Sequence, residues 1–260
     1  MLFLCLFLTP AIADDTARVK AILDGDTLIL EDGRGVRYLG VNTPEWQEPF
    51  SLKAKRLNKS LVEGQTVRLE FDKRKTDGYK RLLAYVFVDG SMVNEKILEE
   101  GLGHAFLFPP NDKYNSKFLG IQKKAKAGHK GMWAKYDESI TLKITQLKPS
   151  EYKKDKWTSA YVRVVNLAVD SVSLKGYALS TSNGQQYIFP DYKLEPGFTV
   201  VISDKGKDGY SRDGQLSLYW KKLSTAWKKN QGTAILTNPE KKVIGVYRYK
   251  GRRIFYDTSK

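Results

Sequence analysis

The first third of the chain holds acidic, amide and guanidinium side chains whose types suit chemistry on a phosphodiester. In chain order they are Asp24, Asp26, Arg37, Asn42, Thr43, Glu45, Asp77 and Arg81. A phosphodiester is an anion, and attack at phosphorus adds charge to its oxygens. Such chemistry therefore needs preorganised positive charge, which forked arginine side chains supply well. A carboxylate beside the attacking water can then act as a base.

Each of these residues also has an ordinary structural interpretation. Asp24-Gly25-Asp26-Thr27 is typical of a turn. Arg37 alternates within a β-type run, where a solvated strand residue is expected, and Thr43-Pro44-Glu45 fits the start of a loop. Asp77 and Arg81 fit an exposed ion pair of little energetic value. Only the combination and its order favour an active site.

Short strands are the first elements that would position these residues. Residues 17–41 alternate apolar and polar side chains, interrupted by Asp24-Gly25 and Asp32-Gly33, which are hairpin signals. Residues 67–71 and 82–88 form two further β-type runs. The pattern predicts about five strands.

Three helices are predicted among these strands. The first follows from the helical spacing of Phe50, Ala54, Leu57 and Leu61, and it stops near Gly64. The other two are predicted over residues 92–100 and 115–127. A five-stranded Greek-key barrel with a helix after the third strand is the OB-fold, which often binds nucleic acid on its open face. The fold class is therefore mainly β with helices.

Four blocks of this sequence resemble the staphylococcal nuclease-like (thermonuclease) family. They are Asp24–Thr27, Arg37–Glu45, Thr76–Val86 and Asp89–Glu95. The resemblance spans about residues 17–134, and it predicts a catalytic OB-fold domain over residues 14–136.

The resemblance implies a calcium site. Asp26 matches the family's calcium-binding carboxylate, and Asn42 with the backbone carbonyl of Thr43 would complete the protein ligands. Hard oxygen ligands suit Ca²⁺. The family reference has an aspartate where this chain has Asn42, so one negative charge is lost. We expect weaker metal affinity or an altered metal preference.

The resemblance also implies the catalytic roles. Glu45 matches the acid that positions or deprotonates the attacking water, and Arg37 and Arg81 match the two arginines that bind the scissile phosphate. Asp24 and Asp77 would be supporting residues. Lysine should not replace Arg37 or Arg81 in supporting activity, because lysine cannot bind two phosphate oxygens at once.

The substrate-facing positions depart from the family pattern. Tyr79 matches the family's aromatic residue beside the nucleotide. Gly78 replaces a typical lysine, and Phe106 and Phe108 replace typical tyrosines. Stacking surfaces are kept, but polar contacts to a terminal phosphate are lost.

Positive charge is concentrated in the second half of the chain. Residues 14–138 contain 22 Lys and Arg against 19 Asp and Glu, a net charge of +3, and residues 139–260 contain 22 against 10, a net charge of +12. A region with this positive charge favours binding of a polyanion such as nucleic acid, an acidic cell-wall polymer or anionic lipid. An ordinary solubilising surface is the alternative.

Residues 140–250 resemble a lamin-tail-like domain, an immunoglobulin-like β-sandwich. The resemblance lies in Val162–Leu167, Leu174–Ser180, Tyr187–Pro190, Leu194–Gly197 and Val200–Ile202. No catalytic cluster is evident there, so binding or tethering is expected. Its two Trp-Lys-Lys stretches, beginning at Trp220 and Trp227, suit a polyanion-binding surface or, equally, core tryptophans beside solvated lysines.

Residues 1–13 are predicted to be a signal peptide cleaved after Ala13. The run is uncharged and apolar, and it is shorter than the roughly 20 residues of a membrane-spanning helix. Because the one cysteine, Cys5, lies within it, zinc-thiolate sites and cysteine catalysis are excluded from the mature chain. We expect a secreted or periplasmic monomer without a transmembrane helix.

Two functions follow from these patterns. The first is a secreted calcium-dependent endonuclease acting on DNA and RNA and leaving 3′-phosphate ends, with a basic domain that holds substrate or attaches to an anionic cell-surface polymer. The second is a non-catalytic nucleic-acid-binding OB module with a basic tethering domain. Retention of Asp26, Arg37, Glu45 and Arg81 favours the enzyme. His104 and His129, the two histidines, form no metal or triad pattern, and structural roles are expected.

Overall fold

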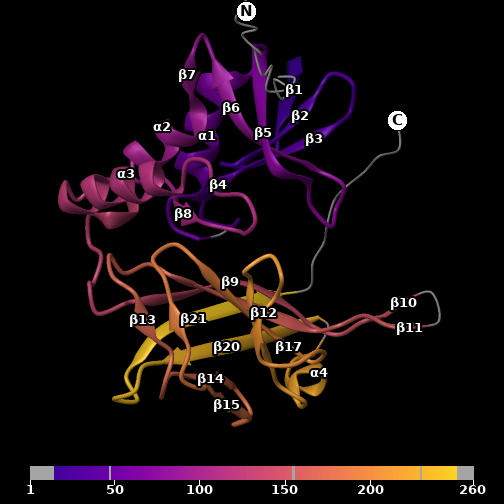
Figure 1. The fold of residues 1–260 in the computed structure, drawn as a ribbon, viewed down its shortest axis with the longest axis vertical. Helices are drawn as coiled ribbons and strands as arrows, with labels where there is room; N and C mark the ends of the chain where they lie inside the picture. The colour runs from indigo at the N-terminus through magenta and orange to yellow at the C-terminus, as the bar shows by residue number, and fades with distance from the viewer. Residues whose placement is uncertain (1–14, 47, 154–155, 229, 251–260) are drawn as a thin grey trace, which may run out of the picture.

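The computed structural model describes residues 15–46, 48–153, 156–228 and 230–250. The predicted signal peptide, residues 1–13, lies outside the described residues. The first half of the chain forms a barrel with helices, and the second half forms a β-sandwich that packs against it (Figure 1). Within the described residues, no helix has the length and apolar character needed to cross a bilayer.

The barrel half contains short strands and three α-helices, as predicted. Its elements are β1 (Asp15–Ile22), β2 (Thr27–Leu30), β3 (Gly35–Tyr38), β4 (Gly40–Asn42), α1 (Ser51–Val62), β5 (Thr66–Thr76), β6 (Leu82–Val88), β7 (Ser91–Met92), α2 (Val93–Glu99), β8 (His104–Phe106), α3 (Asn115–Ala127) and the 3₁₀ helix η1 (Gly131–Trp133).

Five strands close into the predicted OB-type barrel. The sheet runs β3-β2-β1-β5-β6-β7, and a parallel pairing of β3 with β6 closes it. Inward positions alternate along each strand, and they include the fully buried Leu28, Leu30, Val36 and Leu69. The prediction of a mainly β fold is confirmed. The sequence pattern ended the fourth strand at Phe71, whereas β5 continues to Thr76 and carries the chain toward the site.

Helix α1 covers the barrel and holds one turn of the site. Ala54, Asn58 and Val62 recur every four residues on its buried face, so one side of the helix faces the core. The Asn58 amide donates to the carbonyl of Asp24 at 2.9 Å, and its Oδ1 accepts from the Tyr38 hydroxyl at 2.7 Å. A buried asparagine thus joins the helix to β3 and to the turn before β2.

Gly25 is required for close packing in that turn. A Cβ atom at Gly25 would lie 2.6 Å from Cβ of Ala54 and 2.7 Å from the side chain of Thr43. Only glycine lets the turn approach both α1 and the chain after β4. This approach brings Asp26 to Thr43.

The second half is a β-sandwich with one short helix. Its elements are β9 (Leu142–Lys148), β10 (Tyr152–Lys153), β11 (Lys156–Trp157), β12 (Tyr161–Asn166), β13 (Val172–Ser173), β14 (Ala178–Thr181), β15 (Gln186–Ile188), β16 (Lys193–Leu194), β17 (Thr199–Ser203), β18 (Gly209–Tyr210), β19 (Leu216–Tyr219), α4 (Leu223–Ala226), β20 (Gln231–Thr237) and β21 (Val243–Lys250).

Two sheets enclose the second core. One runs β18-β19-β17-β12-β9, and the other runs β15-β14-β20-β21. Trp220 and Trp227 belong to this core, each 7% exposed, with ring centroids 5.7 Å apart in an edge-to-face arrangement. The interpretation of these tryptophans as a polyanion-binding surface is therefore wrong.

The two halves share backbone and side-chain contacts. The amide of Leu107 donates to the carbonyl of Gly197 at 2.9 Å, and Phe198 packs against both cores. Arg74 forms an ion pair with Asp213 at 2.5 Å. Lys126, 6% exposed on α3, reaches Glu138 at 2.9 Å and the carbonyl of Leu167 at 3.2 Å. The sandwich is thus held against one side of the barrel half, the side that carries β4 and β8 (Figure 1).

Candidate active site

The two predicted catalytic arginines lie on the same face of one strand pair. In the parallel β3–β6 register Val36 is opposite Leu82, so Arg81, one residue before β6, lies beside Gly35. A Cβ atom at Gly35 would lie 3.3 Å from Cγ of Arg81. Residues two apart on a strand share a face, so Arg37 and Arg81 project from the same side. The closure of the barrel therefore brings together residues 44 positions apart.

Asp26 is the buried anchor of the site. It is 5% exposed, and its Oδ2 accepts the Thr43 amide at 2.7 Å and the Thr43 hydroxyl at 3.0 Å. Its Oδ1 accepts the Thr27 hydroxyl at 3.1 Å and faces Nε of Arg37 at 3.1 Å. A buried carboxylate needs such partners, and here they also fix the chain after β4.

Arg37 is held by four of its five N–H groups. Besides Asp26, it donates from Nη1 to the carbonyls of Tyr38 and Val41, each at 2.6 Å, and from Nη2 to Oδ1 of Asn42 at 2.8 Å. Since a guanidinium has five donors, one N–H of Nη2 remains for a substrate oxygen. Arg37 therefore holds the chain around β4 in place and keeps one N–H group that can donate a hydrogen bond to substrate.

Two of the three side chains or carbonyls predicted to bind calcium, Asp26 and Asn42, contact Arg37 directly. Asn42 ends β4, which pairs with β8 in a separate two-stranded sheet, and its Nδ2 lies 3.3 Å from the Thr43 carbonyl. The carboxylate of Asp26, the amide oxygen of Asn42 and the carbonyl of Thr43 are all hard oxygen donors and fit Ca²⁺ in kind. They include a single carboxylate, and among the described residues no group of three or more His, Cys, Asp or Glu gathers around a shared point.

Asp24 adds negative charge next to this set. Its Oδ1 accepts the backbone amide of Asp26 at 3.0 Å. Loss of water around the carboxyl and repulsion from Asp26 raise the pKa of Asp24. Loss of water is the larger of these two causes, and the repulsion from Asp26 adds to it. Two carboxylates this close favour a nearby cation.

Asp77 binds Arg81 through both carboxylate oxygens. Oδ2 of Asp77 accepts Nε of Arg81 at 2.8 Å and Nη2 at 2.7 Å, and Oδ1 accepts the backbone amides of Tyr79 and Arg81. This arrangement leaves the Nη1 edge of Arg81 directed away from Asp77. The pair is half-buried and shapes the turn before β6, so it is more than the exposed ion pair considered from sequence. The Arg81 guanidinium lies 5.5 Å from the ring of Tyr79, which is 56% exposed.

Glu45 lies in an exposed turn that the second half of the chain helps to hold. Its backbone amide donates to Oε2 of Glu48 at 2.8 Å, and the Glu48 amide donates back to its carbonyl at 2.9 Å. Oε1 of Glu48 forms an ion pair with Nζ of Lys143, in β9, at 3.2 Å. Sequence reasoning did not single out Glu48 or Lys143, because only the docking of the sandwich brings Lys143 near residue 48.

Phe106 and Phe108, predicted to face substrate, lie at the junction of the two halves. The guanidinium of Arg163, in β12, is 5.8 Å from the Phe106 ring and 4.9 Å from the Phe108 ring. Arg74 also lies 5.2 Å from Phe108. Their role in binding a base stays a prediction, and the second half of the chain forms part of their surroundings.

His104 is a further neighbour of the site. It is 1% exposed, and its Nε2 lies 3.5 Å from Nδ2 of Asn42. Burial, and then repulsion from Lys143, lower the pKa of His104 to about 3, so its imidazole is neutral near pH 7. The expected structural role is consistent with this packing. No spacing pattern in the sequence could have placed it beside Asn42.

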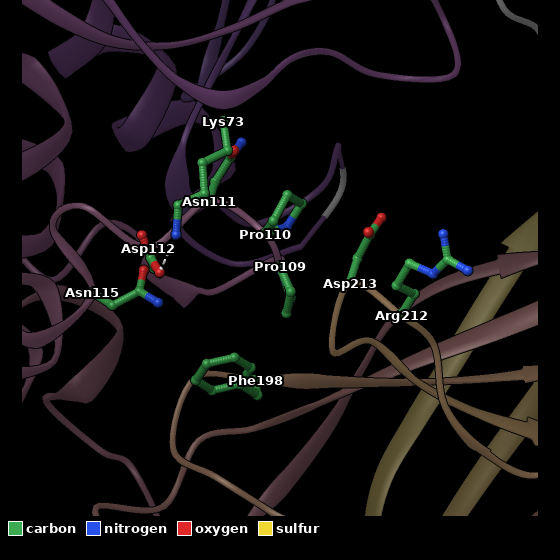
Figure 2. Close-up of a pocket in the computed structure, with 9 residues that line it drawn as sticks. All are labelled: Lys73, Pro109, Pro110, Asn111, Asp112, Asn115, Phe198, Arg212 and Asp213. Carbon is green, nitrogen blue, oxygen red and sulfur yellow. Dashed lines mark hydrogen bonds and ion pairs between the residues drawn. The ribbon is translucent and has the colours of Figure 1, made fainter.

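A separate cavity of about 330 Å³ lies between the two halves, and the residues that line it include none of the predicted catalytic or metal-binding residues (Figure 2). Pro109, Pro110 and Asp112 line it from the barrel half, and Phe198, Arg212 and Asp213 line it from the sandwich. Because it contains neither of the two arginines on the β3–β6 face, we do not assign the chemistry to it.

Comparison with known proteins gives a family match for each half of the chain. The staphylococcal nuclease homologue family model matches residues 35–135, and the lamin tail domain model matches residues 138–251. The thermonuclease of Staphylococcus hyicus is 38% identical over 130 residues, which are 46% of this chain and 77% of that protein. The thermonuclease of Staphylococcus intermedius is 40% identical over 124 residues, which are 44% of this chain and 74% of that protein.

A third relative, endonuclease YncB of Bacillus subtilis (strain 168), is 41% identical over 124 residues, which are 44% of this chain and 59% of that protein. The barrel fold and the paired arginines define a nuclease-type OB domain, here joined to a second domain. This chain belongs to the staphylococcal nuclease homologue family, and its barrel domain is followed by a lamin tail domain.

Proposed function

We propose that this chain is a calcium-dependent endonuclease that hydrolyses phosphodiester bonds of DNA and RNA and leaves 3′-phosphate ends. The observation that supports it most is the convergence of Arg37 and Arg81 on one face of the β3–β6 pair, with Asp26 bound to Arg37. Membership of a family whose named relatives are thermonucleases and an endonuclease supports the same reaction class.

The residues of the site have separate tasks in this reaction. Glu45 accepts a proton from water, and the water oxygen forms a bond to phosphorus while the bond from phosphorus to the 5′-oxygen breaks. The leaving oxygen takes a proton and becomes a 5′-hydroxyl, and the phosphate stays on the 3′-oxygen. Arg81, through its Nη1 edge, and Arg37, through its remaining N–H, donate to the phosphate oxygens as charge grows there.

Calcium, when bound, would supply a fixed positive charge beside the phosphate. Asp26, Asn42 and the Thr43 carbonyl are the residues that would hold it. The hydrogen bonds from Thr27 and Thr43 orient the Asp26 carboxylate without neutralising it. In this proposal neutral donors hold the metal site in place, and among the described residues Arg37 is the cation that contacts Asp26 directly.

Digestion of defined substrates tests this proposal. Purified protein should cut single- and double-stranded DNA and RNA with calcium, and it should lose this activity when EGTA removes the metal. Glu45→Gln should lower the rate of cleavage by about 100-fold or more, because general-base catalysis contributes roughly that much. Glu63→Gln, in the turn after α1, is the matched control. Binding of DNA without cleavage in calcium would favour the non-catalytic binding module.

We also propose that the chain is secreted or periplasmic and monomeric, and that its basic second domain can attach to an anionic cell-surface polymer. The uncharged apolar run of residues 1–13 and the +12 net charge of residues 139–260 support these proposals. Protein recovered from outside the cell membrane should begin at Asp14 by N-terminal sequencing. Light scattering should give the monomer mass, and sedimentation with cell walls should fall as salt rises.

A further inference from the structure

Arg163 is a cation of the lamin tail domain surrounded by neutral groups at the junction with the barrel. Its guanidinium lies 5.8 Å from the Phe106 ring and 4.9 Å from the Phe108 ring, and its Nη1 donates to the hydroxyl of Thr199 at 3.2 Å. Within the described residues, no carboxylate forms an ion pair with it. Loss of water lowers the pKa of Arg163, and interactions with Tyr161 and Tyr79 offset this effect only in part.

A partly enclosed charge is normally paired, because its loss of hydration must be offset. The faces of the two phenylalanine rings give part of this compensation through cation–π attraction. Thr199 takes one of five N–H groups. Arg163 is half-buried rather than sealed, so its other donors can reach a ligand. The ligand that such a fork suits best is a phosphate or carboxylate.

Two sets of neighbouring residues link Arg163 to the candidate active site. On one side, Tyr79 acts electrostatically on Arg163, and the Tyr79 ring lies 5.5 Å from the Arg81 guanidinium. On the other side, the Phe106 ring lies 6.3 Å from the His104 ring, and His104 lies 3.5 Å from Asn42. The residues around Arg163 are therefore the residues predicted to face substrate.

We propose that Arg163 binds a backbone phosphate of the polynucleotide, adjacent to the scissile phosphate, so that the lamin tail domain supplies one subsite of the nuclease. This proposal rests on the proposed function. It assigns Phe106 and Phe108 the task of holding Arg163 in place. Phosphate could reach this subsite from a polynucleotide or as free inorganic phosphate, and the polynucleotide is the assignment made here.

The test compares full-length Arg163→Gln and Arg163→Lys with Arg248→Gln. Arg248 is exposed on β21, in the other sheet of the same domain, so its variant removes an equal charge from a different strand. KM and kcat are measured for a long single-stranded DNA and for a chromogenic phosphodiester of one nucleotide. Arg163→Gln should raise KM for the long DNA about 10-fold, the loss expected for one charge-assisted contact, with kcat and the one-nucleotide substrate unchanged.

Salt dependence gives the second readout. The slope of log affinity against log salt should fall by about 1 for Arg163→Gln, because one fewer phosphate contact releases fewer counterions. Arg163→Lys should keep most of the slope, and Arg248→Gln should leave KM unchanged. Inhibition by inorganic phosphate that is equal in wild type and Arg163→Gln agrees with the polynucleotide as the ligand. Inhibition that is lost in Arg163→Gln, with KM for long DNA unchanged, identifies free phosphate instead and overturns the proposal.

Two further outcomes are decisive. An equal loss of activity on both substrates, or a fall in melting temperature shared by Arg163→Gln and Arg163→Lys, would make Arg163 structural and sink the proposal. Fluorescence anisotropy with labelled DNA in EGTA measures binding without cleavage. If the wild type binds DNA but does not cut it, the proposed function fails, whereas the anisotropy salt slope still decides the role of Arg163.

Discussion

At the scale of single residues, the two arginines that share a face have different amounts of freedom. Arg37 uses four of its N–H groups on Asp26, Tyr38, Val41 and Asn42, whereas Arg81 is bound through Nε and Nη2 to Asp77 and keeps its Nη1 edge. Arg37 therefore mainly holds the surrounding chain in place, whereas Arg81 keeps more of its donor groups for substrate.

This difference predicts different results for two identical substitutions. Arg81→Lys should lower kcat/KM by about 10-fold or more, because lysine lacks the forked donor, and it should leave the melting temperature unchanged. Arg37→Lys should lower activity and also destabilise the fold by about 1–3 kcal/mol, because buried carbonyls lose their donor. Denaturant unfolding and steady-state kinetics measure both effects. Arg56→Lys, exposed on α1, is the control, and equal stability of both active-site variants would contradict the prediction.

Substitution of the neutral Asn42 by aspartate should strengthen the calcium affinity. Asn42→Asp would add a second carboxylate to a donor set that has one, so the calcium concentration for half-maximal activity should fall, on the order of 10-fold. Asn183→Asp adds the same charge on an exposed loop of the second domain and should change nothing. Calorimetry with calcium checks the direction. An unchanged calcium requirement would show that Asn42 lies outside the metal shell.

At the scale of elements, loops of the site are held by partners from distant strands. Glu48 joins the turn of Glu45 to Lys143 in β9, and Asp72 joins β5 to the start of α3. Both links use a carboxylate that accepts backbone amides, which fixes chain direction as well as position.

Lys143 should influence catalysis without touching substrate. In Lys143→Ala, Glu48 loses its cationic partner and the turn of Glu45 gains freedom, so kcat should fall several-fold. KM should change little. Lys143→Arg should restore most of the rate, because it keeps the ion pair. Lys175→Ala, exposed in the same domain, is the control. Unchanged kcat in Lys143→Ala would show that Glu48 alone holds the turn.

Asp72 should make stability depend on acid pH. Burial alone would raise its pKa, but hydrogen bonds from the amides of Lys113 and Lys73 and from the Tyr85 hydroxyl outweigh burial and lower it below 3.8. Because the pKa of Asp72 is lower in the folded than in the unfolded protein, its carboxylate stabilises the fold at pH values above the unfolded pKa. This contribution is lost as the pH falls below about 4. Asp72→Asn should lose about 2 kcal/mol near pH 7. Its stability should also fall less steeply between pH 4 and 2, and parallel pH profiles would contradict this.

At the scale of the whole molecule, the lamin tail domain is part of the surroundings of the site. Gly197 has a φ of +74° in the turn between β16 and β17, and a Cβ atom there would lie 3.1 Å from Cγ of Leu107 in the barrel half. The two domains approach each other closely at this glycine. Their docking therefore depends on a residue without a side chain.

This contact can be measured with two matched glycines. Gly197→Ala and Gly184→Ala both force alanine into a positive φ, and each should cost about 1 kcal/mol for that reason. A Cβ atom at Gly184 meets nothing within 4 Å, so only Gly197→Ala adds a clash between domains. Its melting temperature should fall further than that of Gly184→Ala. Equal melting temperatures would show that the domains separate freely.

The amino-acid sequence by itself determined the local features of this protein. Alternation and helical spacing predicted the strands, the barrel and the limits of α1 and α3, because these patterns record which face of each element is buried. The order of Asp26, Arg37, Asn42, Glu45 and Arg81 predicted the candidate site through its resemblance to a family.

Only the tertiary structure decided what distant elements do to one another. The β3–β6 closure placed Arg81 beside Gly35, β8 placed His104 beside Asn42, and domain docking placed Lys143 beside Glu48 and Arg163 beside Phe108. The core positions of Trp220 and Trp227 were also decided there. The type of a residue limits which partners its side chain can bind. Packing between distant parts of the chain then determines which partner it contacts, and sequence periodicity carries no information about that contact.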